Sequence, residues 1–81
     1  MYVIGQINKP GAYPMNPQLN VLQALSVAGG TNPYAALHNI MILRGSGKSQ
    51  KRFEFHYDDV SKGRYLDQNI LLESGDVVVV P

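Results

Sequence analysis

One stretch decides the fold: NVLQALSVAGG, residues 20–30. Val21, Leu25 and Ala28 repeat at the i, i+4, i+7 spacing that gives a helix one apolar face. A helix of fewer than about 12 residues is marginally stable alone in water, so this one has to be stabilised by packing. We therefore predict one main helix that packs across a sheet formed by the rest of the chain.

The residues at the two ends of this stretch set its limits. Asn20 suits the N-cap position, because its side-chain oxygen can accept a hydrogen bond from a free N–H of the first turn. Gly29 can adopt the left-handed conformation that ends a helix, and Gly30 lets the chain turn away. The helix is expected to begin after Asn20 and to end before Gly29.

Length and composition predict one small domain. A chain of 81 residues allows a single core, so we expect residues 1–81 to form one domain. The absence of cysteine excludes disulfides and thiolate metal sites. A net charge of +1, with the charges scattered, argues against nucleic-acid binding. No leader or membrane-spanning run is visible, and strands are predicted close to both ends. We therefore expect a soluble domain excised from a longer protein.

A hairpin is predicted before the helix. Residues 2–7 form a β-rich run, and residues 12–15 are expected to return as a second strand. Between them, Pro10 and Gly11 fit the central positions of a type II turn. Pro14 cannot donate to a strand ladder, so the second strand is placed at an edge of the sheet.

Three further strands are predicted after the helix. A short helical turn is expected within residues 32–39, followed by strands at 40–44 and 51–57. In 51–57, aromatic and polar residues alternate, which predicts a core face and a solvent face that carries His56. The valine run 77–80 predicts a central strand, buried on both faces, beside the first strand. Together these elements indicate an α+β protein, a β-grasp with a mixed sheet and one main helix packed across it.

Three stretches carry a family resemblance: VIGQINKPGAYP at 3–14, VLQALSVAGG at 21–30 and GDVVVVP at 75–81. In this order they resemble the soluble-ligand-binding β-grasp (SLBB) domain of the outer-membrane polysaccharide export protein family. The family's lipoprotein cysteine and membrane-spanning segment are absent, which fits an excised domain.

The resemblance implies a periplasmic module of an outer-membrane-associated protein that exports capsular polysaccharide or exopolysaccharide. Its implied role is in ring assembly of the export channel, with contact to the polysaccharide as a further expectation. The implied partners are other copies of the parent protein in a ring homo-oligomer, an inner-membrane polysaccharide copolymerase and the polysaccharide chain.

Four residues are candidates for contacting a sugar. Tyr34 stands beside Asn32 in the loop after the helix, and an aromatic ring can stack on the apolar face of a sugar. Gln6 and Arg44 can supply hydrogen bonds to hydroxyl or uronic acid groups. The alternative for Tyr34 is a structural one, in which the ring covers the C-terminal end of the helix.

Other chemistry finds little support in the sequence. The GSGKS segment at 45–49 lacks the first glycine and the following helix of a phosphate-binding loop, so we interpret it as a loop between strands. Asp58 and Asp59 fit the start of a capped helical turn. His38 and His56 have no acidic or second histidine partner at ligand spacing, so no metal site is expected. No residue has the surroundings of an activated nucleophile, so neither an enzyme nor a cofactor is expected.

Two alternatives to the export module stay open. One is a small module that binds a soluble ligand near the loop after the helix. The other is a protein-interaction domain in another envelope complex. A fold does not determine a function, so the site has to decide between them.

Overall fold

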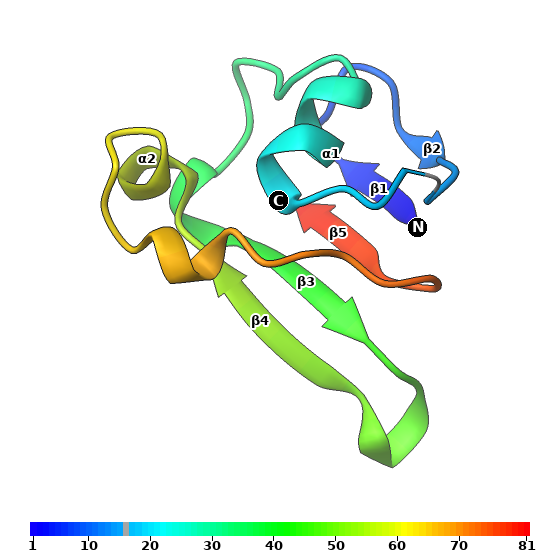
Figure 1. Cartoon of the computed structure of the whole chain (residues 1–81). Helices are drawn as coiled ribbons and strands as arrows, with labels where there is room; N and C mark the ends of the chain where they lie inside the picture. The colour runs from blue at the N-terminus through cyan, green and yellow to red at the C-terminus, as the bar shows by residue number, and fades with distance from the viewer. Residues whose placement is uncertain (16) are drawn as a thin grey trace.

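A computed structural model describes residues 1–15 and 17–81 and shows one five-stranded sheet. The strand order is β2-β1-β5-β3-β4. β1 pairs with β5 in parallel, whereas the other neighbours are antiparallel, so the sheet is mixed, as predicted. The strands, drawn in Figure 1, are β1 (Tyr2–Gly5), β2 (Gly11–Ala12), β3 (Ile40–Arg44), β4 (Lys51–Phe55) and β5 (Val77–Val80).

The main helix, α1 (Val21–Val27), has the predicted limits. The Asn20 side chain accepts a hydrogen bond from the Gln23 backbone N–H, and the Gln23 side chain accepts one from the Asn20 backbone N–H, both at 2.9 Å. This reciprocal pair is a capping box. After the helix, Gly29 and Gly30 have φ angles of 85° and 81°, the left-handed conformation expected of them. The α+β fold with one main helix is therefore confirmed.

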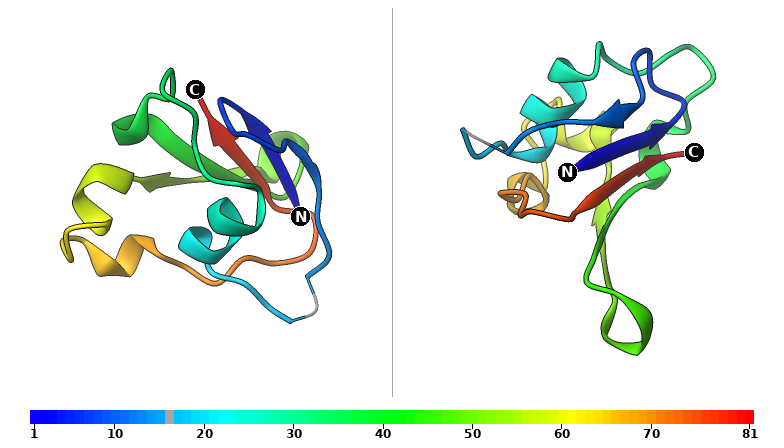
Figure 2. Two further views of the ribbon diagram at one scale, coloured as in Figure 1. Left: turned by 90° about the horizontal axis from the view of Figure 1, so that it is seen from above. Right: turned by 90° about the vertical axis from the view of Figure 1, so that its right-hand side faces the viewer.

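The core lies between α1 and one face of the sheet. The chain before β5 lies on the same side of the sheet as α1 (Figure 2) and is joined to it where Leu72 N–H donates to the Leu19 carbonyl. The inner sheet face and the helix together bury Val3, Val21, Ala24, Leu25, Ile40, Ile42, Phe55, Leu72, Val78 and Val80.

The other face of the sheet stays open. In β5, Val78 and Val80 are fully buried, whereas Val77 and Val79 are only partly buried. The prediction that the valine run is buried on both faces is therefore wrong: β5 is central, but α1 covers only one face. The strand register sets the open residues side by side. We call this surface the outer sheet face; its apolar residues are Tyr2, Ile4, Met41, Leu43, Val77 and Val79.

The hairpin before the helix differs from the prediction. β2 is only two residues long, so the predicted strand at 12–15 is wrong for most of its length. Gly11 has a φ of 153°, which is not the value of about 80° that a type II turn requires. The loop instead hydrogen-bonds to the end of the helix. Asn8 donates from its backbone N–H to the Gly30 carbonyl at 3.0 Å and from its side chain to the Gly29 carbonyl at 2.8 Å.

Short helical turns connect the later strands. β4 ends earlier than predicted because Tyr57 begins a helical turn, and the β3–β4 hairpin extends away from the rest of the chain (Figure 1). The GSGKS segment forms a single 3₁₀ turn in this hairpin, which confirms the loop interpretation. No helix within 1–15 or 17–81 is long and apolar enough to cross a membrane. The turns are η1 (Leu37–Asn39), η2 (Gly47–Ser49), α2 (Tyr57–Val60) and η3 (Leu66–Gln68).

Gly5 in β1 lies so close to the Val80 backbone in β5 that we predict a strict requirement for glycine at position 5. A Cβ on Gly5, whose φ is 96°, would lie 2.0 Å from the Val80 carbonyl oxygen. Gly75 has a similar φ of 88°, but its Cβ would meet nothing within 4 Å. We expect Gly75→Ala to lower the free energy of unfolding by about 1 kcal/mol, from backbone strain alone. Gly5→Ala should lower it by about 3 kcal/mol or more, because the clash adds to the strain.

Urea unfolding of the two variants measures this difference. Equal losses of stability would show that the contact between Gly5 and Val80 does not constrain the sheet.

Candidate functional site

The structure brings three of the four predicted sugar-binding residues together. The Asn32 side-chain amide donates to the Gln6 side-chain oxygen at 2.8 Å, and the Asn32 side-chain oxygen accepts from the Tyr34 backbone N–H at 2.9 Å. A β-bridge between Ile7 and Thr31 holds the two segments side by side. We call Gln6, Asn32 and Tyr34 the Asn32 cluster.

The Tyr34 ring is free to contact a ligand. Its side chain is 85% exposed, so the alternative in which it covers the end of α1 is wrong. Asn32 explains this position, because its side chain organises the turn in which Tyr34 stands. The cluster therefore combines an exposed tyrosine with a pair of amide side chains on neighbouring segments, residue types suited to stacking on a sugar ring and to hydrogen bonds with its hydroxyls.

Arg44 lies apart from this cluster. Arg44 is the last residue of β3 and lies near the start of β5. Gln6 follows β1 and lies near the opposite end of β5. The Arg44 guanidinium donates to both carboxylate oxygens of Asp76, at 3.0 and 2.8 Å, and pairs with Glu73 at 3.0 Å. The same group lies 4.9 Å from the centre of the Phe53 ring. Arg44 therefore binds within the chain and does not join the other three candidates.

Asp76 is held as a carboxylate by its hydrogen bonds. Desolvation acts to raise its pKa, but the hydrogen bonds from Arg44 and from the Glu73 backbone N–H outweigh it, so the pKa of Asp76 lies below its usual value. The hydrogen bond to Asp76 likewise raises the pKa of Arg44. The pair stays ionised over the neutral range and into weak acid.

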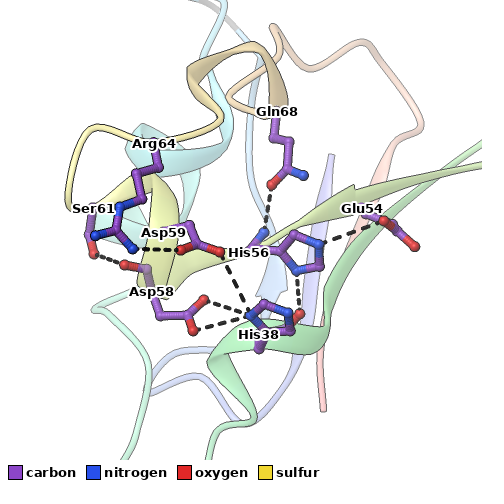
Figure 3. Close-up of polar contacts among 8 residues, drawn as sticks. All are labelled: His38, Glu54, His56, Asp58, Asp59, Ser61, Arg64 and Gln68. Atoms are coloured by element: carbon purple, nitrogen blue, oxygen red, sulfur yellow. Dashed lines mark hydrogen bonds and ion pairs between the residues drawn. The ribbon is translucent and has the colours of Figure 1, made fainter.

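A second polar cluster gathers where β3 begins and β4 ends (Figure 3). The His38 Nδ1 atom lies 3.1 Å from each carboxylate oxygen of Asp58 and 4.0 Å from an oxygen of Asp59. We call these three residues the His38 triad. The inference that His38 has no acidic partner is therefore wrong. Ile40 pairs with Phe55, so the residues before β3 and after β4 come together although they are distant in sequence.

His56 packs against His38 of the triad. Its ring stacks on that of His38, with centroids 4.0 Å apart and planes at 16°. Its Nδ1 atom donates to the His38 carbonyl at 2.6 Å, and its Nε2 atom lies 3.6 Å from a Glu54 carboxylate oxygen. Its backbone N–H donates to the Gln68 side chain at 2.8 Å. His56 lines the same open groove as Arg52 and Glu54, as the predicted solvent face requires, but its side chain is only 22% exposed because His38 stacks on it.

The two carboxylates of the triad stand in the first turn of α2, as predicted, but neither caps it: His56 is the N-cap residue and makes no side-chain capping hydrogen bond. Desolvation acts to raise the pKa of Asp58, but the hydrogen bond with His38 and its charge hold that pKa below the usual value. Asp59 also pairs with Arg64 at 3.6 Å. The Asp58 carboxyl is therefore available as an anion at neutral pH.

An open groove adjoins the triad. It has a volume of about 430 Å³, and Met41 in its lining connects it with the outer sheet face. Its polar wall is formed by His38, Arg52, Glu54 and His56.

A comparison with protein families decides the identity of the domain. The family model described as SLBB domain matches residues 1–80. The chain belongs to the SLBB domain family. In this SLBB domain the stretches that carry the resemblance contact one another. Asn8 donates to the carbonyls of both glycines after α1, and the Gln6 N–H donates to the Val80 carbonyl at 2.7 Å.

The buried ion pair of this SLBB domain predicts an acid-sensitive stability. Because the folded-state pKa of Asp76 is lowered, its contribution is present above the unfolded-state pKa of about 3.9 and is lost as the pH falls through the folded-state value. Asp76→Asn should lower the free energy of unfolding by about 2 kcal/mol at pH 7, because it removes the charge-assisted hydrogen bonds between Arg44 and a buried carboxylate. The stability of this variant should then depend less on pH below 4 than that of the wild type.

Urea unfolding at pH 7 and in acid tests this, with Glu73→Gln as the control. Glu73 pairs with the same arginine, but its side chain is 61% exposed, so its loss should change stability by less than about 1 kcal/mol. Equal effects of the two substitutions would contradict the role given to Asp76.

Proposed function

We propose that this SLBB domain is a periplasmic, non-enzymatic assembly module of a protein that exports capsular polysaccharide or exopolysaccharide. Copies of the domain contact one another around the export channel. The observation that carries the proposal is the outer sheet face, a row of apolar side chains on the side of the sheet that α1 does not cover. Tyr2 and Ile4 on this face are 50% and 44% exposed.

The chemistry of this face suits a second copy of the same chain. Apolar residues from three adjacent strands form its centre, and burying them in an interface would release the water that now covers them. At its β4 side, Arg52 and Glu54 lie 3.8 Å apart and carry opposite charges. A surface with an apolar centre and both charges at its rim has the composition of a protein interface. In a ring it would meet a different surface of the next copy, because a face that pairs with itself closes a dimer.

The size of the domain determines how strong such a contact can be. The whole chain exposes 4962 Å², so a standard interface of about 800 Å² per partner would take about a sixth of that surface. A domain of this size is expected to offer less than that to each neighbour, so isolated copies should associate weakly and remain mostly monomeric. In the proposed parent protein, neighbouring domains and an inner-membrane polysaccharide copolymerase would supply the remaining contacts of the ring.

The Asn32 cluster supports a second role, contact with the exported polysaccharide. An exposed tyrosine ring beside two amide side chains can stack on a sugar and hydrogen-bond to it. The cluster lies near the C-terminal ends of β1 and β5, where Gln6 hydrogen-bonds to both Val80 and Asn32, whereas Arg44 lies at the other end of β5. We therefore assign sugar contact to Gln6, Asn32 and Tyr34 and leave Arg44 out of it.

The assembly role predicts that a charge on the outer sheet face abolishes weak self-association. Ile4→Glu places a carboxylate in the centre of the face, whereas Val27→Glu places one on the exposed side of α1; the two side chains are 44% and 49% exposed. Sedimentation velocity over a range of concentrations should show association of wild type and Val27→Glu, but not of Ile4→Glu. Association that survives Ile4→Glu would reject the outer sheet face as the contact surface.

Sugar contact predicts a separate result in a titration with exopolysaccharide fragments. Amide NMR signals from Thr31 to Tyr34 should shift in a saturable manner, and Tyr34→Ala should weaken binding by about tenfold, the loss of one stacked aromatic ring. Tyr65→Ala is the control, since Tyr65 is also exposed, at 59%, and lies outside the cluster. If fragments cause no shift, the cluster has no sugar role and the assembly role stands alone. Shifts caused only by a small soluble molecule would favour the ligand-binding alternative.

A further inference from the structure

We propose that the His38 triad binds a divalent transition-metal ion, with Zn²⁺ as the first candidate and water in the remaining coordination positions. The imidazole nitrogen of His38 and one oxygen each from Asp58 and Asp59 all lie within 4.8 Å of one another (Figure 3). The site is separate from the Asn32 cluster and does not depend on the proposed role in export.

The donor distances are close to those of an occupied site. Zinc bonds of about 2.0–2.2 Å to nitrogen and oxygen place the donors of a tetrahedral site roughly 3.3 Å apart. His38 Nδ1 lies 3.1 Å from Asp58 and 4.0 Å from Asp59. A rotation of the Asp59 side chain that brings its oxygen closer to both His38 and Asp58 would complete the geometry, since the three donor atoms already lie within 4.8 Å of one another. The ion would replace the proton that His38 and Asp58 share in their hydrogen bond, and the imidazole would carry its proton on Nε2.

The surroundings hold the ligands in place before any ion binds. His56 stacks on His38 and donates a hydrogen bond to its carbonyl, which restricts both the ring and the backbone of the ligand. The Gln68 side chain accepts from the His56 backbone N–H and so anchors the start of α2, where the two aspartates stand. Such outer contacts orient metal ligands and commonly change metal affinity by about 10–100-fold.

Charge and ligand type select the ion. Two carboxylates and a neutral imidazole carry two negative charges, which match a divalent cation. A nitrogen ligand favours zinc, copper or nickel over calcium and magnesium, which prefer oxygen alone. Arg64 lies 3.6 Å from Asp59 and competes with the ion, but its side chain is 68% exposed and can move into solvent.

Titration of the untagged chain with ZnCl₂ tests the proposal, followed by amide NMR and by calorimetry. We expect one ion per chain and shifts that centre on His38, Asp58 and Asp59. His38→Ala and Asp59→Asn should each weaken binding by at least about tenfold. Asp67→Asn, which removes an acidic side chain outside the triad, should bind as the wild type does. Thermal unfolding of each variant confirms that it is folded.

Three results would overturn the proposal. One is the absence of saturable zinc binding at millimolar concentration. Another is wild-type affinity in both triad variants, which would move the ion to a site elsewhere, such as His56 and Glu54. The third is equal binding of Mg²⁺ and Zn²⁺, which would show only attraction to the carboxylates. Binding of Co²⁺ with the visible absorption bands of a low-coordinate complex would support a direct nitrogen and oxygen ligand set.

Discussion

The structure depends on one buried charge. Among the described residues, Asp76 is the one charged side chain that is buried, with no exposed surface. Its carboxylate accepts from Arg44 at the end of β3 and from the Glu73 backbone, while its carbonyl accepts from the Tyr2 N–H at the start of β1. One residue at the head of β5 thus connects the three central strands. Because a buried carboxylate without partners is strongly unfavourable, a shift in strand register that broke these contacts would be costly.

Much of the fold follows from local signals in the sequence. Asn20 and the two glycines define α1, and the apolar spacing between them requires a sheet to pack against. The valine run predicts a central strand, but it carries no information about which faces are covered, since valine is equally suited to both. Only the position of α1 shows that Val77 and Val79 face outward. The hairpin turn was mispredicted because its loop binds the end of α1, a partner about twenty residues away.

The candidate sites show the same division between local and distant signals. The Asn32 cluster could be predicted because Asn32 and Tyr34 are close in sequence, although the contact with Gln6 comes from the fold. Arg44 was placed with them by residue type, and its true partner, Asp76, is 32 residues away. The His38 triad joins segments 20 residues apart, so ligand spacing in the sequence did not reveal it. One signal in the sequence could have revealed the triad. If the predicted strands at 40–44 and 51–57 pair antiparallel, the start of the first lies beside the end of the second, which brings His38 close to Asp58.

The arrangement of surfaces suggests a division of roles. One sheet face builds the core with α1, the opposite face leaves apolar side chains uncovered by that helix, and the exposed tyrosine of the Asn32 cluster belongs to neither. The His38 triad stands beside the groove that adjoins the outer sheet face, so a bound ion would stiffen the rim of that surface.

The most direct test of this account uses the absence of cysteine from the chain. Single cysteines at positions 4 and 27 would report on the outer sheet face and on α1, which are similarly exposed in the isolated domain. The rate of thiol labelling is measured in the isolated domain and in the assembled export protein that we propose contains it. We predict similar rates at both positions in the isolated domain, and labelling at position 4 that is at least about tenfold slower on assembly. Equal labelling of both positions in the assembled protein would contradict the account.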